Sequence, residues 1–451
     1  MAEHSVSFVR TEMLPQQEPP SSQVGAVKWV RENLFNGILN SVLTVLSMLA
    51  VLWIVSHLWT WFANSIWEAH SLNECREILA GASGACWGVI NDRWHQLLFG
   101  FYPSDMYWRP ILAFVLLFAA LAPVLFLSLP RKMLWFSVVY PFFGVWLLWG
   151  GSVWGPVTVF LGLAVLGLIV LTVTESLGAI LTAILTVVVA LFLFLNPLGW
   201  VAGLFGAETA PLAGLFPIVP NLSEGLESVI PASITPVASR EFGGFMISIV
   251  IGVAGIALSL PLGILFALGR QSTMPLIKYI SVIFIEFIRG VPLITLLFTA
   301  SLLLNYFLPP GTNFDLILRV IIMVTLFATA YMAEVIRGGL AALPKGQYEA
   351  ADALGLDYWK AQRLIIMPQA LKISIPGIVN TFIGLFKDTT LVVFIGLLDP
   401  IGLASAIRAS SDWQGIYWEL FIFIGAIFWI FCFGMSRYSM YLERLLKTDH
   451  R

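Results

Sequence analysis

A few charged and hydroxyl side chains interrupt otherwise apolar stretches of this chain. The clearest group is the consecutive set Lys387, Asp388, Thr389 and Thr390. If the stretch lies in lipid, such groups should face a bundle interior or a watered cavity, because charge in hydrocarbon is costly. Asp388 could pair there with a cationic group of a ligand, while the threonines offer hydroxyls. The alternative is a helix end near the interface, where Lys387 extends to water and Asp388 caps the next segment.

Two further pairs of opposite charge have the three-residue spacing of neighbours on one helix face. They are Glu286 with Arg289 and Glu334 with Arg337. This spacing is typical of local ion pairs. We interpret Glu334 mainly as the partner of Arg337, with a gating role as the alternative. For Glu286 and Arg289, a mutual pair near the inner interface and a role in ligand passage both stay open.

The chain lacks the motifs of several enzyme classes. The phosphate-binding pattern of Gly, four residues and Gly-Lys-Ser/Thr is absent, which excludes ATP hydrolysis by that route. A His-Glu-x-x-His zinc pattern and a Gly-x-Ser-x-Gly nucleophile elbow are absent too. The five histidines are scattered. An integral-membrane enzyme, which needs a cluster of catalytic or metal-binding groups, is therefore the least favoured interpretation.

The segment 344–371 is too polar to span a membrane but has the composition of ordered structure. Residues 347–354 are strong helix formers, and Gly355 can supply the left-handed residue that ends a helix. Three side chains share one face of this predicted helix, with two acids alongside: Tyr348, Ala351 and Leu354, then Glu349 and Asp352. Small alanines permit close approach, and the acids can meet basic groups. The segment predicts a short helix offered to a partner.

Composition places the chain in a membrane. Of its 451 residues, 59% are hydrophobic and 11% are charged, with a mean hydropathy of +0.90. A net charge of −2 without a basic stretch excludes a nucleic-acid partner. About ten windows reach the length of about 20 apolar residues that a spanning helix needs. They are roughly 36–62, 111–129, 133–150, 156–173, 177–195, 243–269, 279–308, 315–337, 373–398 and 416–436.

The windows fall into two groups separated by a stretch rich in Pro, Gly, Ser and Glu. The expected regions are a cytoplasmic tail, a first group of spans with an outer loop near 63–110, a periplasmic linker, a second group of spans, and a second cytoplasmic tail. Their limits are 1–33, 34–195, 196–240, 241–440 and 441–451. The division of 156–195 into two spans rests on the short break Thr174-Glu175-Ser176, because Glu175 would be costly in mid-membrane.

The distribution of basic residues predicts the orientation. Lysine and arginine, for example Arg131 and Lys132, are concentrated in every second loop, which is typical of cytoplasmic loops. Both ends of the chain lie on the same side as these loops, so both should be in the cytoplasm. Cys75 and Cys86 then share an outer loop. A disulfide between them fits that side of the membrane, and a pair of free thiols is the alternative.

Within the segment 344–371, one spacing resembles the EAA loop of ABC import permeases. It runs Glu-Ala-Ala, three residues, Gly, nine residues, Ile, one residue, a hydrophobic residue and Pro. The matching positions are Glu349, Ala350, Ala351, Gly355, Ile365, Met367 and Pro368, with Asp352 beside them. The family usually has Leu where this chain has Met367, which is a volume-conserving change. The resemblance implies a coupling helix that seats in a groove of a separate ATPase subunit.

Two more stretches, 286–293 and 387–391, resemble the polar amino-acid branch of these permeases, which includes histidine permeases. The likeness covers Phe242 to the C-terminus, and a likeness to general L-amino-acid permeases extends to the N-terminal addition. The implied fold is an all-α integral membrane protein, a polytopic helix bundle with a C-terminal type I ABC importer permease core.

The implied function is inward translocation of polar L-amino acids across a bacterial inner membrane. The implied partners are ATPase subunits that bind the ATP, a second homologous permease subunit and a periplasmic amino-acid-binding protein. No cofactor or metal is expected in this chain. The expected substrate path uses the charged groups described above, with Asp388 facing the substrate's α-amino group: Asp388, Lys387, Thr389, Thr390, Glu286, Arg289 and Glu334. The main rival is a secondary transporter driven by an ion gradient, which intramembrane charges also permit.

Overall fold

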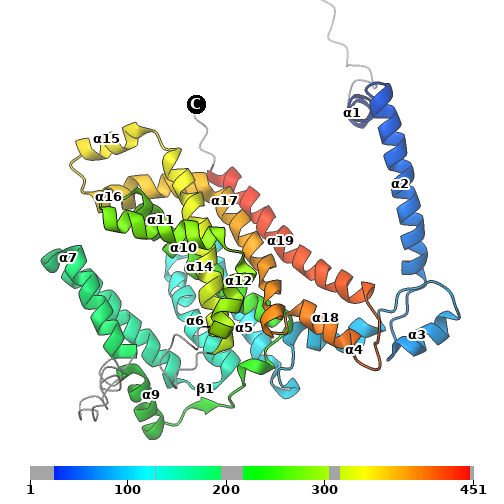
Figure 1. Cartoon of the computed structure of the whole chain (residues 1–451), viewed down its shortest axis with the longest axis horizontal. Coiled ribbons are helices and arrows are strands. Elements are labelled where there is room, and N and C mark those ends of the chain that lie inside the picture. The colour runs from blue at the N-terminus through cyan, green and yellow to red at the C-terminus, as the bar shows by residue number, and fades with distance from the viewer. Residues whose placement is uncertain (1–24, 127, 195–216, 304–314, 447–451) are drawn as a thin grey trace, which may run out of the picture. The chain divides into compact units, whose positions relative to one another are not determined.

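The structure is a computed structural model that describes residues 25–126, 128–194, 217–303 and 315–446, with the side chains of 174–181, 183 and 184 excepted. Over these ranges nearly all regular structure is helical (Figure 1). One short antiparallel pair joins β1 (Gly151–Ser152) to β2 (Ser233–Ile234). The all-α prediction is confirmed.

The chain divides into two compact units, and the first ends at Gly88. Its helices are α1 (Gly25–Asn33), α2 (Ile38–Ala63) and α3 (Leu72–Leu79). No residue of α2 is buried, although the helix is apolar on all sides, which suits a helix surrounded by lipid. Cys75 of α3 forms a disulfide with Cys86, so the structure contains the bridge and not the free thiols.

The second unit begins with α4 (Gly88–Phe99), α5 (Trp108–Leu125) and α6 (Leu134–Trp149). Two hydrogen bonds join α6 to α5. The Tyr140 hydroxyl donates to the Ala113 carbonyl at 2.6 Å, and the Ser137 hydroxyl donates to the Ala120 carbonyl at 2.6 Å. Side-chain hydroxyls thus satisfy carbonyls between adjacent apolar helices, where lipid offers no donor.

Helical backbone continues from Trp154 to Phe194 as α7 and passes through the expected break at 174–176 without interruption. The helix nevertheless folds back on itself. A Cβ added to Gly162 would lie 3.0 Å from Phe194 Cζ, whereas 32 residues of straight helix would separate the two by about 48 Å. The chain therefore reverses within α7 and forms two arms, as two spans in this region require.

The sequence predicts a periplasmic linker at 196–240, of which 196–216 lies outside the described residues. In the structure, α5 and α6 belong to one compact unit with the second group of spans. A long-range aromatic cluster joins the two groups of helices. The Phe242 ring stacks on Trp149 at 4.4 Å and meets Tyr102 edge-on at 5.6 Å between centroids. The Arg109 guanidinium also donates to the Thr235 carbonyl at 2.6 Å.

The second group of spans forms the most extensively packed part of the molecule. Before it, α9 (Ile218–Val229) packs on α7. The elements of the second group are α10 (Gly244–Gln271), α11 (Pro275–Gly290), α12 (Leu293–Phe298), the π-helix η6 (Thr299–Leu303), α14 (Leu316–Ala341), α15 (Lys345–Ala353), α16 (Tyr358–Ala361), the π-helix η7 (Gln362–Ile366), α17 (Met367–Asp388), the 3₁₀ helix η8 (Thr389–Ile395), α18 (Pro400–Arg408) and α19 (Trp418–Leu446). Short 3₁₀ turns lie at η2 (Ser104–Met106), η3 (Arg131–Met133) and η5 (Ser239–Glu241).

Glycines let α10 approach α14 closely. A Cβ on Gly263 would lie 2.8 Å from the Met332 Cβ, and one on Gly255 would lie 3.2 Å from Val324. Gly339 of α14 faces Ser374 of α17 in the same way. Small residues at such positions are typical of helix pairs in membranes, because backbone proximity supplies the packing energy.

Eight helices of the described residues are long and apolar enough to cross a membrane. A ninth candidate is α11 followed by α12 and η6, which bend by 104° at the break. Leu185–Phe194, the second arm of α7, is a shorter apolar helix. Each of the roughly ten predicted windows therefore has a helical counterpart.

Candidate functional site

Glu334, on α14, is the centre of an ion network that joins three helices. Its carboxylate receives two hydrogen bonds from the Arg337 Nε, at 3.2 and 3.1 Å, and one from Arg337 Nη2 at 3.0 Å. Arg270 of α10 approaches it to 2.8 Å, and Arg289 of α11 to 3.6 Å. The expected Glu334–Arg337 pair is present, but Glu334 also forms ion pairs with arginines of two neighbouring helices.

Arg270 was not among the predicted site residues, and it corrects one expectation. Its Nη1 lies 2.8 Å from Glu286 as well as 2.8 Å from Glu334. Glu286 is thus paired with Arg270 from the preceding helix, not with Arg289. The short turn between α10 and α11 makes this possible, because it returns the chain beside the end of α10. Sequence spacing within one helix cannot show such a contact.

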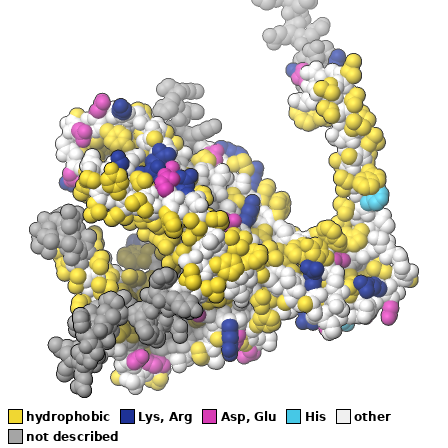
Figure 2. Space-filling model, in the orientation of Figure 1, with side chains coloured by type: hydrophobic (Ala, Val, Ile, Leu, Met, Phe, Trp, Pro, Cys, Tyr) yellow, Lys and Arg dark blue, Asp and Glu magenta, His cyan; other side chains and the backbone are white. Residues whose placement is uncertain are grey.

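The network carries three guanidinium groups against two carboxylates, so its net charge is one positive. Glu334 is the least exposed member, at 15% of its side chain, while Arg289 and Arg337 are 36% and 41% exposed. The Arg289 guanidinium also lies 5.6 Å from the Tyr331 ring centre. Figure 2 shows basic and acidic side chains gathered over α11 and α14. Arg289 and Arg337 are the basic members most accessible to an anionic group.

The predicted group at 387–390 lies where one helix type gives way to another. α17 ends at Asp388, and the tighter 3₁₀ helix η8 begins at Thr389. Thr389 is fully buried and its hydroxyl donates to the Phe386 carbonyl at 2.8 Å, while the Thr390 hydroxyl donates to the Lys387 carbonyl at 2.9 Å. Asp388 is partly buried and Lys387 is exposed. Among the described residues, no ion pair joins this group to Glu334.

The short helix predicted in the polar segment is α15, and Gly355 follows it with a φ of +68°. The predicted helix and its left-handed terminator are confirmed. Ala351 is 1% exposed and Tyr348 is partly buried against the apolar core beside α14 and α17. Leu354, the C-cap residue, is 72% exposed, so it does not join that buried face. Glu349, Ala350 and Asp352 are exposed.

Side-chain contacts hold this segment in place. The Gln369 amide of α17 donates to the Gln347 side chain at 3.0 Å, which ties α15 to the next span. Asp357 caps α16, where the Lys360 backbone N–H donates to it at 2.9 Å and lowers the pKa of the Asp357 carboxyl. Ile365 packs against the same core as Tyr348, and Pro368 lies in the first turn of α17.

An exposed apolar patch extends over this segment and is not among the features predicted from the sequence. It consists of Leu354, Tyr358, Trp359 and Leu364, each more than half exposed. Large apolar side chains in a segment too polar to span are the signal that could have revealed it. Exposed apolar surface of this kind marks a contact with another protein or with the membrane. Among the described residues, no group of three or more His, Cys, Asp or Glu side chains is placed to hold a metal ion.

Eight spanning helices, a sharply bent ninth candidate and an ordered polar helix between two spans, all among the described residues, are the features of a polytopic membrane transport protein. The comparisons with known proteins make the class specific. Residues 259–448 match the family described as "Binding-protein-dependent transport system inner membrane component". The chain is 59% identical over 99% of its length to the glutamate/glutamine/aspartate/asparagine transport system permease protein BztC of Rhodobacter capsulatus, of which 99% is covered.

A second relative, the inner membrane amino-acid ABC transporter permease protein YhdY of Escherichia coli, is 38% identical with 94% of each chain covered. A solved structure titled as an amino acid ABC transporter with histidines is 31% identical, with a TM-score of 0.40, and covers 44% of this chain and 90% of its own. The chain belongs to the family of amino-acid ABC transporter permeases, multi-pass proteins of the bacterial inner membrane.

Proposed function

We propose that this permease imports glutamate, glutamine, aspartate and asparagine. The observation that carries the proposal is the 59% identity over the full length to a permease named for those four substrates. The one excess positive charge of the Glu334 network supports it, because every amino acid carries a carboxylate and two of these four carry a second one.

The substrate path in this proposal contains the charged groups at both ends of the core. Asp388 receives the α-amino group, and Lys387 stands beside it. Thr389 and Thr390 accept hydrogen bonds there, because their own protons already go to helix carbonyls. Glu286, Arg289 and Glu334 belong to the network that the substrate passes next. The change from α-helix to 3₁₀ helix after Asp388 supports this placement, since broken helices are common at transporter sites.

Transport is coupled to ATP through the segment 344–371. α15 presents Glu349, Ala350 and Asp352 to the cytoplasm, and the patch of Leu354, Tyr358, Trp359 and Leu364 lies beside them. An ATPase subunit docks there and binds the ATP, while this chain contributes no ATPase site. Gln347 and Gln369 transmit the movement, because their hydrogen bond joins α15 to α17.

The working assembly contains two ATPase subunits, a second homologous permease subunit and a periplasmic amino-acid-binding protein that delivers the substrate. Both ends of this chain lie in the cytoplasm. ATPase closure then rotates the two permease cores in opposite senses and opens the path on alternate sides.

The coupling proposal is tested with Gly355→Val and Glu349→Lys. Valine disfavours the +68° backbone of Gly355, and lysine reverses a charge on the exposed face of α15. Each variant should insert normally yet lose ATP-driven uptake and copurification of the ATPase. The matched control is Gly346→Ala, since Gly346 has open space around it and no positive φ. Normal uptake in both variants would remove the coupling role from this segment.

A further inference from the structure

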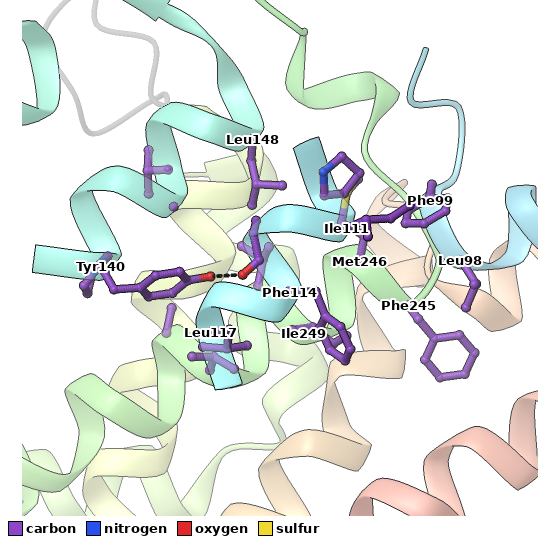
Figure 3. A pocket seen from close by; sticks show the side chains of 18 of the residues that line it. Leu98, Phe99, Ile111, Phe114, Leu117, Tyr140, Leu148, Phe245, Met246 and Ile249 are labelled. Atoms are coloured by element: carbon purple, nitrogen blue, oxygen red, sulfur yellow. Dashed lines mark hydrogen bonds between the residues drawn. The ribbon is translucent and has the colours of Figure 1, made fainter. Parts of the chain in front are cut away.

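A crevice of about 680 Å³ lies between the helices of the N-terminal addition and the permease core. α5 and α6 form one wall, α10 and α19 form the other, and the end of α4 closes it (Figure 3). Phe114 and Leu117 come from α5, Tyr140 and Leu148 from α6, and Met246 from α10. These helices belong to one compact unit. The crevice occupies the halves of α5, α6 and α10 that lie nearest to α4.

The lining offers water few partners. Of the described residues that line the crevice, none has a charged, amide or small hydroxyl side chain. The Tyr140 hydroxyl donates to the Ala113 carbonyl at 2.6 Å, and the Trp149 ring N–H donates to the Ser239 hydroxyl at 2.8 Å. A buried water needs two to four polar partners, so the chemistry of this space is that of a hydrocarbon.

The crevice opens onto the surface that the bilayer covers. Four lining residues are at least 39% exposed and mark its mouth: Trp94, Ile111, Val145 and Leu258. They lie on helices that span the membrane or flank a span. Its floor is formed by Ala113 and Leu117, which are 3% and 7% exposed. A molecule from the surrounding lipid can enter without crossing water.

The volume decides between a lipid chain and a helix. A spanning helix about 11 Å wide and 30 Å long occupies about 2,800 Å³, which is far too much. An 18-carbon chain takes about 540 Å³ if each carbon occupies about as much as a water molecule. We propose that one acyl chain of a membrane phospholipid occupies this crevice and forms part of the packing between α5–α6 and α10–α19.

The same lining predicts which part of the lipid the crevice does not recognise. No charged side chain lines the crevice, so the phospholipid headgroup is not selected there. The site recognises the length and volume of the chain. It gives the N-terminal addition a lipid-mediated contact with the moving core, in addition to its direct contacts through Trp149 and Phe242.

The test uses a phospholipid with a photoactivatable group in its acyl chain, in vesicles that hold the full chain with its copurifying subunits. Crosslinks should appear on the floor residues Ala113 and Leu117, which the outer lipid layer does not reach. Ala254→Phe and Ala257→Phe fill the crevice from α10 and should lower these crosslinks several-fold. Ala119→Phe, on an exposed face of α5 outside the crevice, is the matched control and should leave them unchanged.

The wild-type result alone can overturn the proposal, whatever the variants do to folding. Crosslinks confined to exposed residues would show that no lipid chain enters. Floor residues that crosslink to another polypeptide in the complex would give the crevice a protein occupant. Floor crosslinks that persist in both filling variants would place the lipid elsewhere.

Discussion

At the scale of single residues, Glu334 has more ionic partners than any other acidic side chain among the described residues. Its carboxylate meets guanidinium groups from α10, α11 and α14, and it is only 15% exposed. Removal of the central charge leaves Glu286 as the one carboxylate against Arg270, Arg289 and Arg337. Loss of the least exposed member should cost most, since an unpaired charge costs more in a partly buried site than at an exposed one.

Glu334→Gln should therefore lower the free energy of unfolding by about 2 kcal/mol, the scale of a hydrogen bond to a charged group. Glu286→Gln is the matched control. Glu286 is 54% exposed and has one ionic partner, so its loss should cost less than about 1 kcal/mol. Thermal unfolding in detergent measures both. Equal effects of the two substitutions would contradict the central role of Glu334.

Asp399 predicts a pH dependence outside the spans. It is fully buried and caps α18, accepting from the Gly402 N–H at 2.9 Å and the Ile401 N–H at 3.3 Å. Burial outweighs these two bonds and raises the pKa of Asp399 to about 6. A raised carboxyl pKa means that the folded state holds the proton more tightly. Stability is then greatest below about pH 4, falls between pH 4 and 6, and is about 3 kcal/mol lower above that window.

Asp399→Asn should remove the loss of stability between pH 4 and 6, because asparagine caps a helix without a charge. At pH 8 the variant should be more stable than the wild type by about 1–2 kcal/mol, after loss of the longer hydrogen bond. Unfolding midpoints between pH 4 and 8 provide the measurement. A variant that is less stable than the wild type at pH 8 would show that the ionised carboxylate is the favoured form.

At the scale of elements, the sequence predicted the parts that depend on local pattern. α15 and its terminating Gly355 follow from helix propensity and a single glycine, and the spans follow from hydropathy. Long-range contacts do not follow from such patterns. The pairing of Arg270 with Glu286 depends on how the chain turns between α10 and α11, and the exposure of Leu354 depends on what packs beside the end of α15. The contact of Phe242 with Trp149 joins residues that are 93 positions apart.

The closeness of α10 and α14 depends on Gly263. A methyl group there would lie 2.8 Å from the Met332 Cβ and 3.3 Å from the Ala333 nitrogen, so the helices must separate. Gly263→Ala should cost about 1–3 kcal/mol, as is usual for overpacking. Gly425→Ala on α19 is the control, because nothing lies within 4 Å of that position. A Gly263→Ala protein as stable as the control would show that the α10–α14 interface adjusts to the extra methyl group without loss of stability.

At the scale of the whole molecule, the chain combines a permease core with helices that precede the residues matched by the family model. That match covers residues 259–448, whereas BztC matches 99% of the chain. Of the added helices, α5 and α6 share an apolar core with α10 and α14. The first unit, which ends at Gly88, has its own disulfide.

That disulfide tests the orientation of the chain. Cys75 and Cys86 should face the periplasm, where disulfides persist. In spheroplasts treated with a membrane-impermeant reductant, both should then react with an impermeant maleimide. Cys432, on the spanning helix α19, is the internal control and should stay unlabelled. Labelling of Cys75 and Cys86 only after the membrane is opened would reverse the proposed orientation.

The central claim is that this chain moves amino acids only as part of an ATP-driven assembly. Its most direct test is uptake of labelled glutamate into proteoliposomes that contain the chain with its copurifying subunits and an added periplasmic binding protein. Uptake should require ATP, the ATPase subunit and the binding protein together. Uptake by this chain alone under an ion gradient would contradict it and identify a secondary transporter.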